Sequence, residues 1–167
     1  RTNPWMQESS NKVIQNGEIV SFDTDMVGPY GYCADISRAF VCGNIFNDEQ
    51  KQLYLLAAEQ INHNSRLIKN GMSFKEFTDK SWKMPEEYYG NRYSVMVHGI
   101  GLCDEWPAIR YPLDGGERSG HFQKNMTITV ESYIGKVGGK EGVKLEQQYV
   151  VGVNGLELMS HHPLENI

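Results

Sequence analysis

The sequence has few cysteines, no long apolar run and no cluster of basic residues. Cys33, Cys42 and Cys103 are odd in number and lack metal-site spacing, so free thiols in a reducing, cytoplasmic compartment are the simplest interpretation. The apolar runs are far shorter than the ~20 residues that span a bilayer, so we expect no transmembrane segment. The net charge of −5 argues against a nucleic-acid-binding surface.

The size of the chain indicates one domain. Its 167 residues and 40% hydrophobic content are those of an ordinary globular unit. The chain begins with Arg inside the coil-like stretch "RTNPW", and no signal peptide is visible. We therefore expect residues 1–167 to form a single partial domain whose N-terminal part is missing, so the lack of a targeting signal excludes little.

Hydrophobic patterning predicts a β-hairpin followed by a helix. A strand is expected from about Glu18, and "YGYCADISRAFVCG" is typical of its partner, closed by Gly43. In the helix, Asn47 can act as N-cap with Gln50 completing a capping box, and Gly71 supplies the stop. The apolar stripe of this helix is formed by Leu53, Leu56, Ala57 and Ile61.

The second half of the chain predicts mainly strands. A further helix is expected from Ser73 to Pro85, with Phe74, Phe77 and Trp82 as its apolar contacts. After it, "SVMVHGIGL", "MTITVESYIG" and "KLEQQYVVGVNG" have the composition and alternation of strands. The order of hairpin, helices and strands favours an α+β fold, in which helices cover one face of an antiparallel sheet.

Three aspartates crowd the hairpin segment "FDTDMVGPYGYCADISR". Asp is a poor strand former, and a core-facing carboxylate is costly unless something pairs with it. Asp23 and Asp25 are two apart, so on a strand they point to the same face, and Asp35 follows on the next strand. Because converging carboxylates repel one another, the pattern indicates a multivalent metal ion.

Three more candidate ligands lie on predicted strands. His98 ends "VMVHG", and Glu131 and Glu146 lie in "TITVESY" and "VKLEQQYVV". Each alone would be an ordinary buried or solvated residue, but together they match a metal site. Oxygen donors with one nitrogen and no thiolate suit Mn, Fe, Co or Zn. So many carboxylates favour two divalent ions, bridged and roughly 3.5–4 Å apart.

These segments resemble the pita-bread metallopeptidase family of methionine aminopeptidases, Xaa-Pro aminopeptidases, prolidases and creatinase. The resemblance rests on "FDTDMVGPYGYCADISR", "VHGIGLCDEWP", "TITVES" and "GVKLEQQYVV", and it covers residues 16–153. It implies the C-terminal part of a pita-bread catalytic domain, with a curved antiparallel sheet covered by helices. The implied ligands of two divalent ions are Asp23 and/or Asp25, Asp35, His98, Glu131 and Glu146.

Two positions depart from the peptidase pattern. The family's first aspartate lies eleven residues before the second, but here Thr24 holds that place, between Asp23 and Asp25. Either a one-residue bulge leaves one true ligand, or both aspartates reach the metals. The peptidases also carry a histidine shortly after "HGIG". With one residue deleted, Asp104 stands there, either as a solvated loop residue or as a changed acid–base group.

Both departures resemble one branch of the family, the dimethylsulfoniopropionate lyases of marine bacteria, for which iron is reported. The shared segments are "FDTD", "CADIS", "GLCDE" and "GGKEGVKLE". The branch implies cleavage of dimethylsulfoniopropionate to dimethyl sulfide and acrylate by β-elimination. Asp104 is then the candidate base. Tyr93, Trp106 and Tyr133 flank the expected ligands and would attract the sulfonium cation, although each also suits ordinary core packing.

Two other functions stay open at the level of sequence. One is a hydrolase related to Xaa-Pro aminopeptidases or prolidases, with an altered substrate pocket. The other is a pita-bread domain kept as a binding module, which the presence of every ligand class disfavours. The expected partners are a small-molecule substrate and, by resemblance, a second copy in a homodimer, without nucleic acid or membrane.

Overall fold

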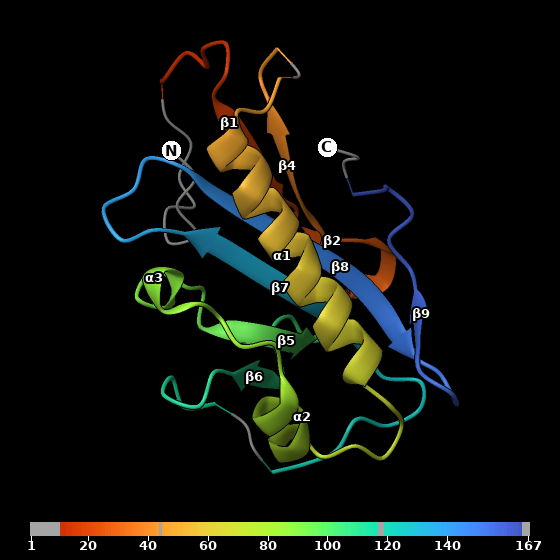
Figure 1. The fold of residues 1–167 in the computed structure, drawn as a ribbon. Helices are drawn as coiled ribbons and strands as arrows, with labels where there is room; N and C mark the ends of the chain where they lie inside the picture. The colour runs from red at the N-terminus through yellow and green to blue at the C-terminus, as the bar shows by residue number, and fades with distance from the viewer. Residues whose placement is uncertain (1–10, 44, 117–118, 165–167) are drawn as a thin grey trace.

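A long helix covers one face of the main sheet. The computed structural model describes residues 11–43, 45–116 and 119–164. In it, α1 (Asp48–Leu67) lies across the two longest strands, β7 (Thr127–Gly135) and β8 (Gly142–Val151), as Figure 1 shows. The expected α+β architecture, with a helix packed on an antiparallel sheet, is confirmed.

The main sheet is antiparallel throughout and has five strands in the order β6, β5, β7, β8, β9. Its shorter members are β5 (Val95–Gly99), β6 (Ala108–Arg110) and β9 (Leu156–Leu158). β7 and β8 form a long hairpin, paired from Thr127 opposite Val150 to Gly135 opposite Gly142. This hairpin is the platform on which the other elements pack.

Two small ladders precede the main sheet in sequence. β1 (Ile19–Asp23) pairs with β4 (Ser37–Val41), and β2 (Met26–Val27) pairs with β3 (Cys33–Ala34) around the turn η1 (Pro29–Gly31). β4 packs against β8, so the aspartate-rich hairpin lies beside the centre of the main sheet. The predicted single hairpin is therefore two short ladders in succession.

The core lies between α1 and the sheet. Side chains at alternate positions of β7, including Ile128 and Val130, are buried together with Leu53, Ala57 and Ile61 of α1. The period of two along a strand sends the intervening residues to the opposite face. The face of β7 and β8 that turns away from α1 is therefore free to carry polar side chains.

The local signals for helix starts are confirmed, whereas those for helix ends are not. Asn47 and Gln50 form the expected capping box, and Ser73 caps α2 (Phe74–Lys80). α1 nevertheless ends at Leu67, before Gly71, which lies in a following turn with φ of +86°. Pro85 does not close the second helix but precedes a third, α3 (Glu86–Tyr89).

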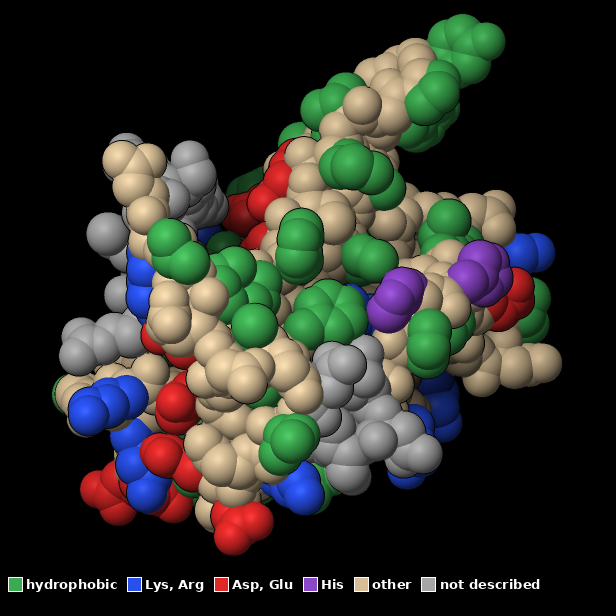
Figure 2. All heavy atoms as spheres, turned by 90° about the horizontal axis from the view of Figure 1, so that it is seen from above, with side chains coloured by type: hydrophobic (Ala, Val, Ile, Leu, Met, Phe, Trp, Pro, Cys, Tyr) green, Lys and Arg blue, Asp and Glu red, His purple; other side chains and the backbone are tan. Residues whose placement is uncertain are grey.

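The β2–β3 hairpin exposes much apolar surface. Val27 and Tyr30 are 72% and 95% exposed, and Met26 and Tyr32 are also largely open to solvent. Seen from above, hydrophobic side chains lie at many points of the surface and along an arm that projects from the body (Figure 2). Such surface is typical of contacts with other protein segments. Among the described helices, none is long and apolar enough to cross a membrane.

The capping box gives a first testable prediction. Asn47→Ala removes the side-chain acceptor for the Gln50 backbone N–H, so the free energy of unfolding should fall by about 1 kcal/mol. Gln52→Ala, at an exposed position one turn further along α1, should change it by less than about 0.5 kcal/mol. Urea denaturation measures both. Equal losses in the two variants would show that the cap contributes nothing of its own.

Candidate metal centre

Three buried ligand-type residues lie on the face of the main sheet that turns away from α1. Glu131 and Glu146 are directly opposite each other on β7 and β8, and His98 lies on β5 beside Thr129. His98, Glu131 and Glu146 are each at most 1% exposed. Each of three neighbouring strands thus carries one buried candidate ligand on this face, with His98 in register with Thr129, two positions before Glu131.

The aspartates enter this cluster from the other side. Asp35 is buried just before β4, and Asp23 closes β1 opposite Ser37. Asp25 lies outside β1, with φ of +34°, so the expectation that Asp23 and Asp25 share one strand face is wrong. The irregular backbone at Asp25 nevertheless brings both to Asp35: each of the three offers an oxygen within 4.8 Å of the others.

The imidazole of His98 lies near both the glutamates of the sheet and Asp35 of the hairpin segment. Its Nε2 atom lies 3.1 Å from Glu146 Oε1, 3.7 Å from Glu131 Oε1 and 3.7 Å from Asp35 Oδ2. The six residues expected as metal ligands, which span more than 120 positions of sequence, are therefore gathered around one spot. Whether Asp23, Asp25 or both bind metal stays a prediction.

The donor atoms fit a transition-metal site. His98 Nδ1 is 3.0 Å from Gly99 O, an arrangement that fixes the ring and leaves Nε2 facing the carboxylates. Glu131 Oε1 is buried and has no hydrogen-bond partner, although a buried carboxylate oxygen normally has one. A cation bound between His98 and the carboxylates would satisfy that oxygen. Oxygen donors with one nitrogen are suitable for a divalent ion.

Sequence reasoning missed two residues that hold the carboxylates. The ammonium of Lys144 is 2.9 Å from Glu131 Oε2, 3.0 Å from Glu146 Oε2 and 3.2 Å from Asp23 Oδ2. Ser37 Oγ lies 2.6 Å from Asp23 Oδ1 and 3.0 Å from Glu146 Oε2, and it accepts a hydrogen bond from Lys144. The sequence contained a signal for Lys144. It is two positions before Glu146, so on a strand the two side chains lie on the same face.

The cluster carries more negative charge than its own cations neutralise. Burial and neighbouring carboxylates, Glu146 first, raise the pKa of Asp35 to about 9, and burial raises the pKa of Glu131 to about 8 despite the opposing charge of Lys144. Burial alone would also raise the pKa of Glu146, but Lys144 and His98 hold it well below its ordinary range. Such opposed pKa shifts arise where buried carboxylates lie close together and compete for positive charge.

Asp104 is not among the groups of converging ligand atoms in the described part of the chain. It is exposed, in the loop that follows β5. Burial raises the pKa of Asp25, and the charges of Asp23 and Asp104 raise it further. The loop is joined to β3 by a 2.7 Å hydrogen bond from Cys33 N to Gly101 O.

The three aromatic residues expected at the substrate site differ in their surroundings. Tyr93 is half-buried, with its ring centroid 5.2 Å from Lys144 Nζ and its hydroxyl 3.3 Å from Glu105 Oε1. Trp106 is 60% exposed in the same loop as Asp104. Tyr133 is buried, and its ring packs over the backbone of Gly142. Tyr93 therefore lies beside Lys144 at the cluster, Trp106 is exposed in the loop that follows β5, and Tyr133 is part of the packed hairpin.

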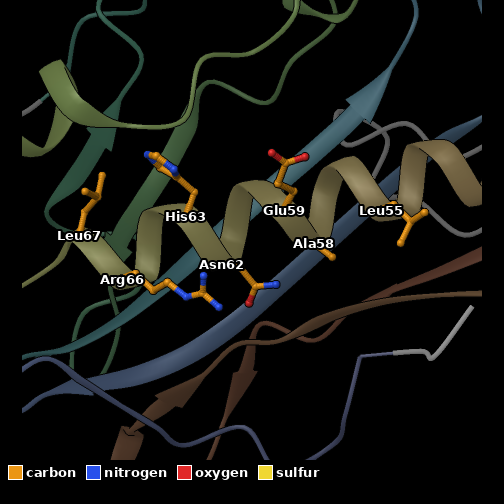
Figure 3. Close-up of a pocket in the computed structure, with 7 residues that line it drawn as sticks. All are labelled: Leu55, Ala58, Glu59, Asn62, His63, Arg66 and Leu67. Atoms are coloured by element: carbon orange, nitrogen blue, oxygen red, sulfur yellow. The ribbon is translucent and has the colours of Figure 1, made fainter.

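A separate surface hollow of about 550 Å³ lies along the outer side of α1 (Figure 3). Its lining comes from that helix alone and includes Glu59, His63 and Leu67. Glu59 Oε1 accepts a 3.3 Å hydrogen bond from Trp82 Nε1, and His63 Nε2 is 3.2 Å from Lys80 O. None of the predicted site residues lines this hollow, so the carboxylate cluster is the candidate site.

Comparison with known proteins agrees with this geometry. The family model "Metallopeptidase family M24" matches residues 1–152, which is most of the chain. The chain belongs to metallopeptidase family M24. Membership in M24 agrees with the order of the candidate ligand segments along the sequence.

Two curated M24 relatives are dimethylsulfoniopropionate lyases. The lyase DddP of Roseovarius nubinhibens is 37% identical over 169 residues, which is 99% of this chain and 38% of that protein. DddP of Roseobacter denitrificans is 35% identical, also over 99% of this chain and 38% of that protein. The resemblance to the lyase branch is thereby confirmed, and the M24 chain spans well under half the length of these relatives.

Solved structures of M24 peptidases share the fold. The X-Pro aminopeptidase of Thermotoga maritima MSB8 superposes with a TM-score of 0.77 at 26% identity, over 97% of this chain and 45% of that one. The Xaa-Pro dipeptidase of Bacillus anthracis gives 0.74 at 29% identity, over 95% and 43%. The fold is thus the pita-bread fold of M24, represented by part of the domain.

The close approach of β5 to the loop that carries Asp104 gives a second prediction. A Cβ on Gly99 would lie 2.1 Å from the backbone oxygen of Trp106, so Gly99→Ala must displace that loop. The free energy of unfolding should fall by roughly 1–3 kcal/mol. Gly90→Ala is the matched control, because its Cβ would meet only the side chain of Val137 at 3.0 Å. A Gly99→Ala variant as stable in urea as Gly90→Ala would contradict the observed contact.

Proposed function

We propose that the chain is the metal-binding part of a lyase that cleaves dimethylsulfoniopropionate to dimethyl sulfide and acrylate. The observation that carries the proposal is Asp104, an exposed carboxylate in the loop that follows the ligand-bearing strand β5 and outside the converging ligand set. Similarity to two lyases over 99% of the chain supports it. A carboxylate there suits proton abstraction better than peptide hydrolysis, for which the related peptidases carry a histidine.

The cluster would hold two divalent ions through Asp23 and/or Asp25, Asp35, His98, Glu131 and Glu146. Bound there, the ions would supply Lewis acidity that draws electron density from the substrate carboxylate. Iron, manganese, zinc and cobalt all suit these donors, and iron is the proposal that follows the lyase branch. The wall of β5, β7 and β8 keeps the ligands rigid, because His98, Glu131 and Glu146 all lie on strands of one sheet.

Asp104 would act as the base of a β-elimination. Its carboxylate takes the proton from the carbon next to the substrate carboxylate, and the electrons of that C–H bond form the C=C bond of acrylate. The bond between the next carbon and sulfur breaks, and dimethyl sulfide leaves with its electron pair. Asp104 is exposed, so it can pass the proton to water and start the next cycle.

The sulfonium group would lie against the aromatic side chains at the border of the cluster. Tyr93 precedes β5, and Trp106 follows it in the same loop as Asp104; aromatic faces attract cations of this kind. Tyr133 is retained as a third candidate on the β7 side. The remaining walls of the substrate pocket are proposed to come from protein outside this chain, since the chain spans 38% of the lyases it matches.

A second function has its own support. The superposition on an Xaa-Pro dipeptidase at 29% identity suits a dimetal peptidase that acts on proline dipeptides. Both proposals require the same metal ligands and differ in the role of Asp104. In either case we propose that the enzyme is soluble and cytoplasmic, acts on a small-molecule substrate and forms a homodimer.

The deciding experiment compares both substrates with the full-length protein. Purified enzyme, loaded separately with Fe²⁺, Mn²⁺, Co²⁺ or Zn²⁺, is given dimethylsulfoniopropionate or an Xaa-Pro dipeptide under identical conditions. Release of dimethyl sulfide, followed by gas chromatography, is expected to exceed dipeptide cleavage by a wide margin. Dipeptide cleavage alone would favour the peptidase, and absence of both activities together with absence of bound metal would favour a binding module.

A third prediction isolates the base. Asp104→Asn keeps the shape of the side chain but removes its basicity, so the lyase rate should fall by roughly 10²–10⁴-fold. Bound metal, measured by inductively coupled plasma mass spectrometry, should be unchanged because Asp104 is outside the ligand set. The control is Glu105→Gln, the adjacent exposed carboxylate, which should retain most activity. An active Asp104→Asn enzyme would exclude Asp104 as the base.

A further inference from the structure

One cation is built into the middle of the carboxylate cluster. Lys144 is 7% exposed, and its ammonium lies within 3.2 Å of oxygens from three different carboxylates. Its remaining contacts are the hydroxyl of Ser37 at 3.1 Å and the ring of Tyr93. A lysine is rarely buried unless it is paired, and here each partner carboxylate is itself a proposed metal ligand.

The contacts of Lys144 are selective between the two oxygens of each glutamate. The ammonium binds Oε2 of Glu131 and Oε2 of Glu146. The other oxygen of each glutamate, Oε1, faces His98 Nε2, at 3.7 Å and 3.1 Å. Lys144 therefore turns both side chains so that Oε1 points into the space shared with the imidazole.

This arrangement offsets a repulsion that the sheet itself creates. Glu131 and Glu146 are cross-strand neighbours, and like charges directly opposite each other destabilise a sheet. Lys144 is on the same strand face as Glu146 and reaches both glutamates at once. A metal ion would relieve the same repulsion, but only when it is bound, whereas the ammonium is present at all times.

The cluster has a net negative charge when its carboxylates are ionised. Asp23, Asp25, Asp35, Glu131 and Glu146 carry five negative charges when ionised, and Lys144 contributes one positive charge. The net charge is then four negative, which two divalent ions neutralise.

We propose that Lys144 is a positioning residue that orients Glu131 and Glu146 and acts as the resident counter-charge of the cluster before metal binds. It keeps the ligands in place in the metal-free protein and adjusts the charge of the site to two divalent ions. The part of this inference that concerns bound metal rests on the proposed metal centre, whereas the part that concerns the metal-free protein does not.

The test is thermal unfolding of the full-length protein, stripped with a chelator and then saturated with Mn²⁺. Without metal, Lys144→Met leaves buried carboxylates unpaired, and its Tm should fall by roughly 5–15 °C. With Mn²⁺ bound, the difference from wild type should shrink to a few degrees, since the ions then supply the positive charge. Lys144→Arg keeps a cation at this position, so its Tm in the metal-free state should fall less than that of Lys144→Met.

Two further variants separate charge from packing. The double variant Glu131→Gln/Lys144→Met removes one negative charge together with the ammonium, so its metal-free Tm should lie above that of Lys144→Met. If Lys144→Met is insoluble, the double variant is compared with wild type instead. Lys136→Met removes an exposed ion pair with Glu87 at 2.8 Å and should change Tm little.

The outcomes separate the inference from the function on which it partly rests. A Lys144→Met deficit of the same size with and without Mn²⁺ would make Lys144 a packing residue and overturn the inference. An unchanged metal-free Tm would overturn it too. If wild type binds no Mn²⁺ and contains no transition metal, the proposed metal centre fails, while the metal-free comparison of the Met, Arg and double variants still decides the role of Lys144.

Discussion

Two glutamates that face each other across a pair of strands impose the central constraint on this fold. Glu131 and Glu146 are buried and directly opposite, so their repulsion must be offset by positive charge. His98 approaches from β5, Lys144 from β8 itself, and the aspartates of the hairpin approach from beyond β4. The sheet, the two small ladders and the loop after β5 all meet at this spot, where a cation is needed.

Much of this arrangement was predictable from sequence because the signals are local or lie in ordered motifs. The capping box at Asn47 depends on residues three apart, and the ligand-bearing strands could be recognised by a polar residue within an apolar run. The end of α1 was not predictable in this way. Gly71 has the positive φ of a stop signal, but it serves the turn whose backbone N–H binds Phe122 O.

The parts of the site that escaped prediction depend on contacts between distant segments. Ser37 is unremarkable in sequence, and its role appears only when β4 packs against β8, whereas Lys144 reaches Glu131 across the β7–β8 hairpin. Asp25 was expected on a strand, but β1 ends at Asp23 and the chain turns with positive φ. M24 membership agrees with the proposed ligand set, whereas the proposed reaction rests on an exposed loop residue, Asp104, and loops differ among relatives more than strands do.

The alternation of side chains along β7 links two properties that are usually studied apart. Val130 packs under α1, and the next residue, Glu131, points to the opposite face toward His98. The same alternation relates Leu145 to Glu146 on β8. A shift of backbone that accommodates a larger or smaller core residue is transmitted through a single peptide unit to a ligand. Selection for heat resistance through this core would therefore also change the affinity of the proposed metal centre, whose altered metal preference would be an early sign of poor repacking.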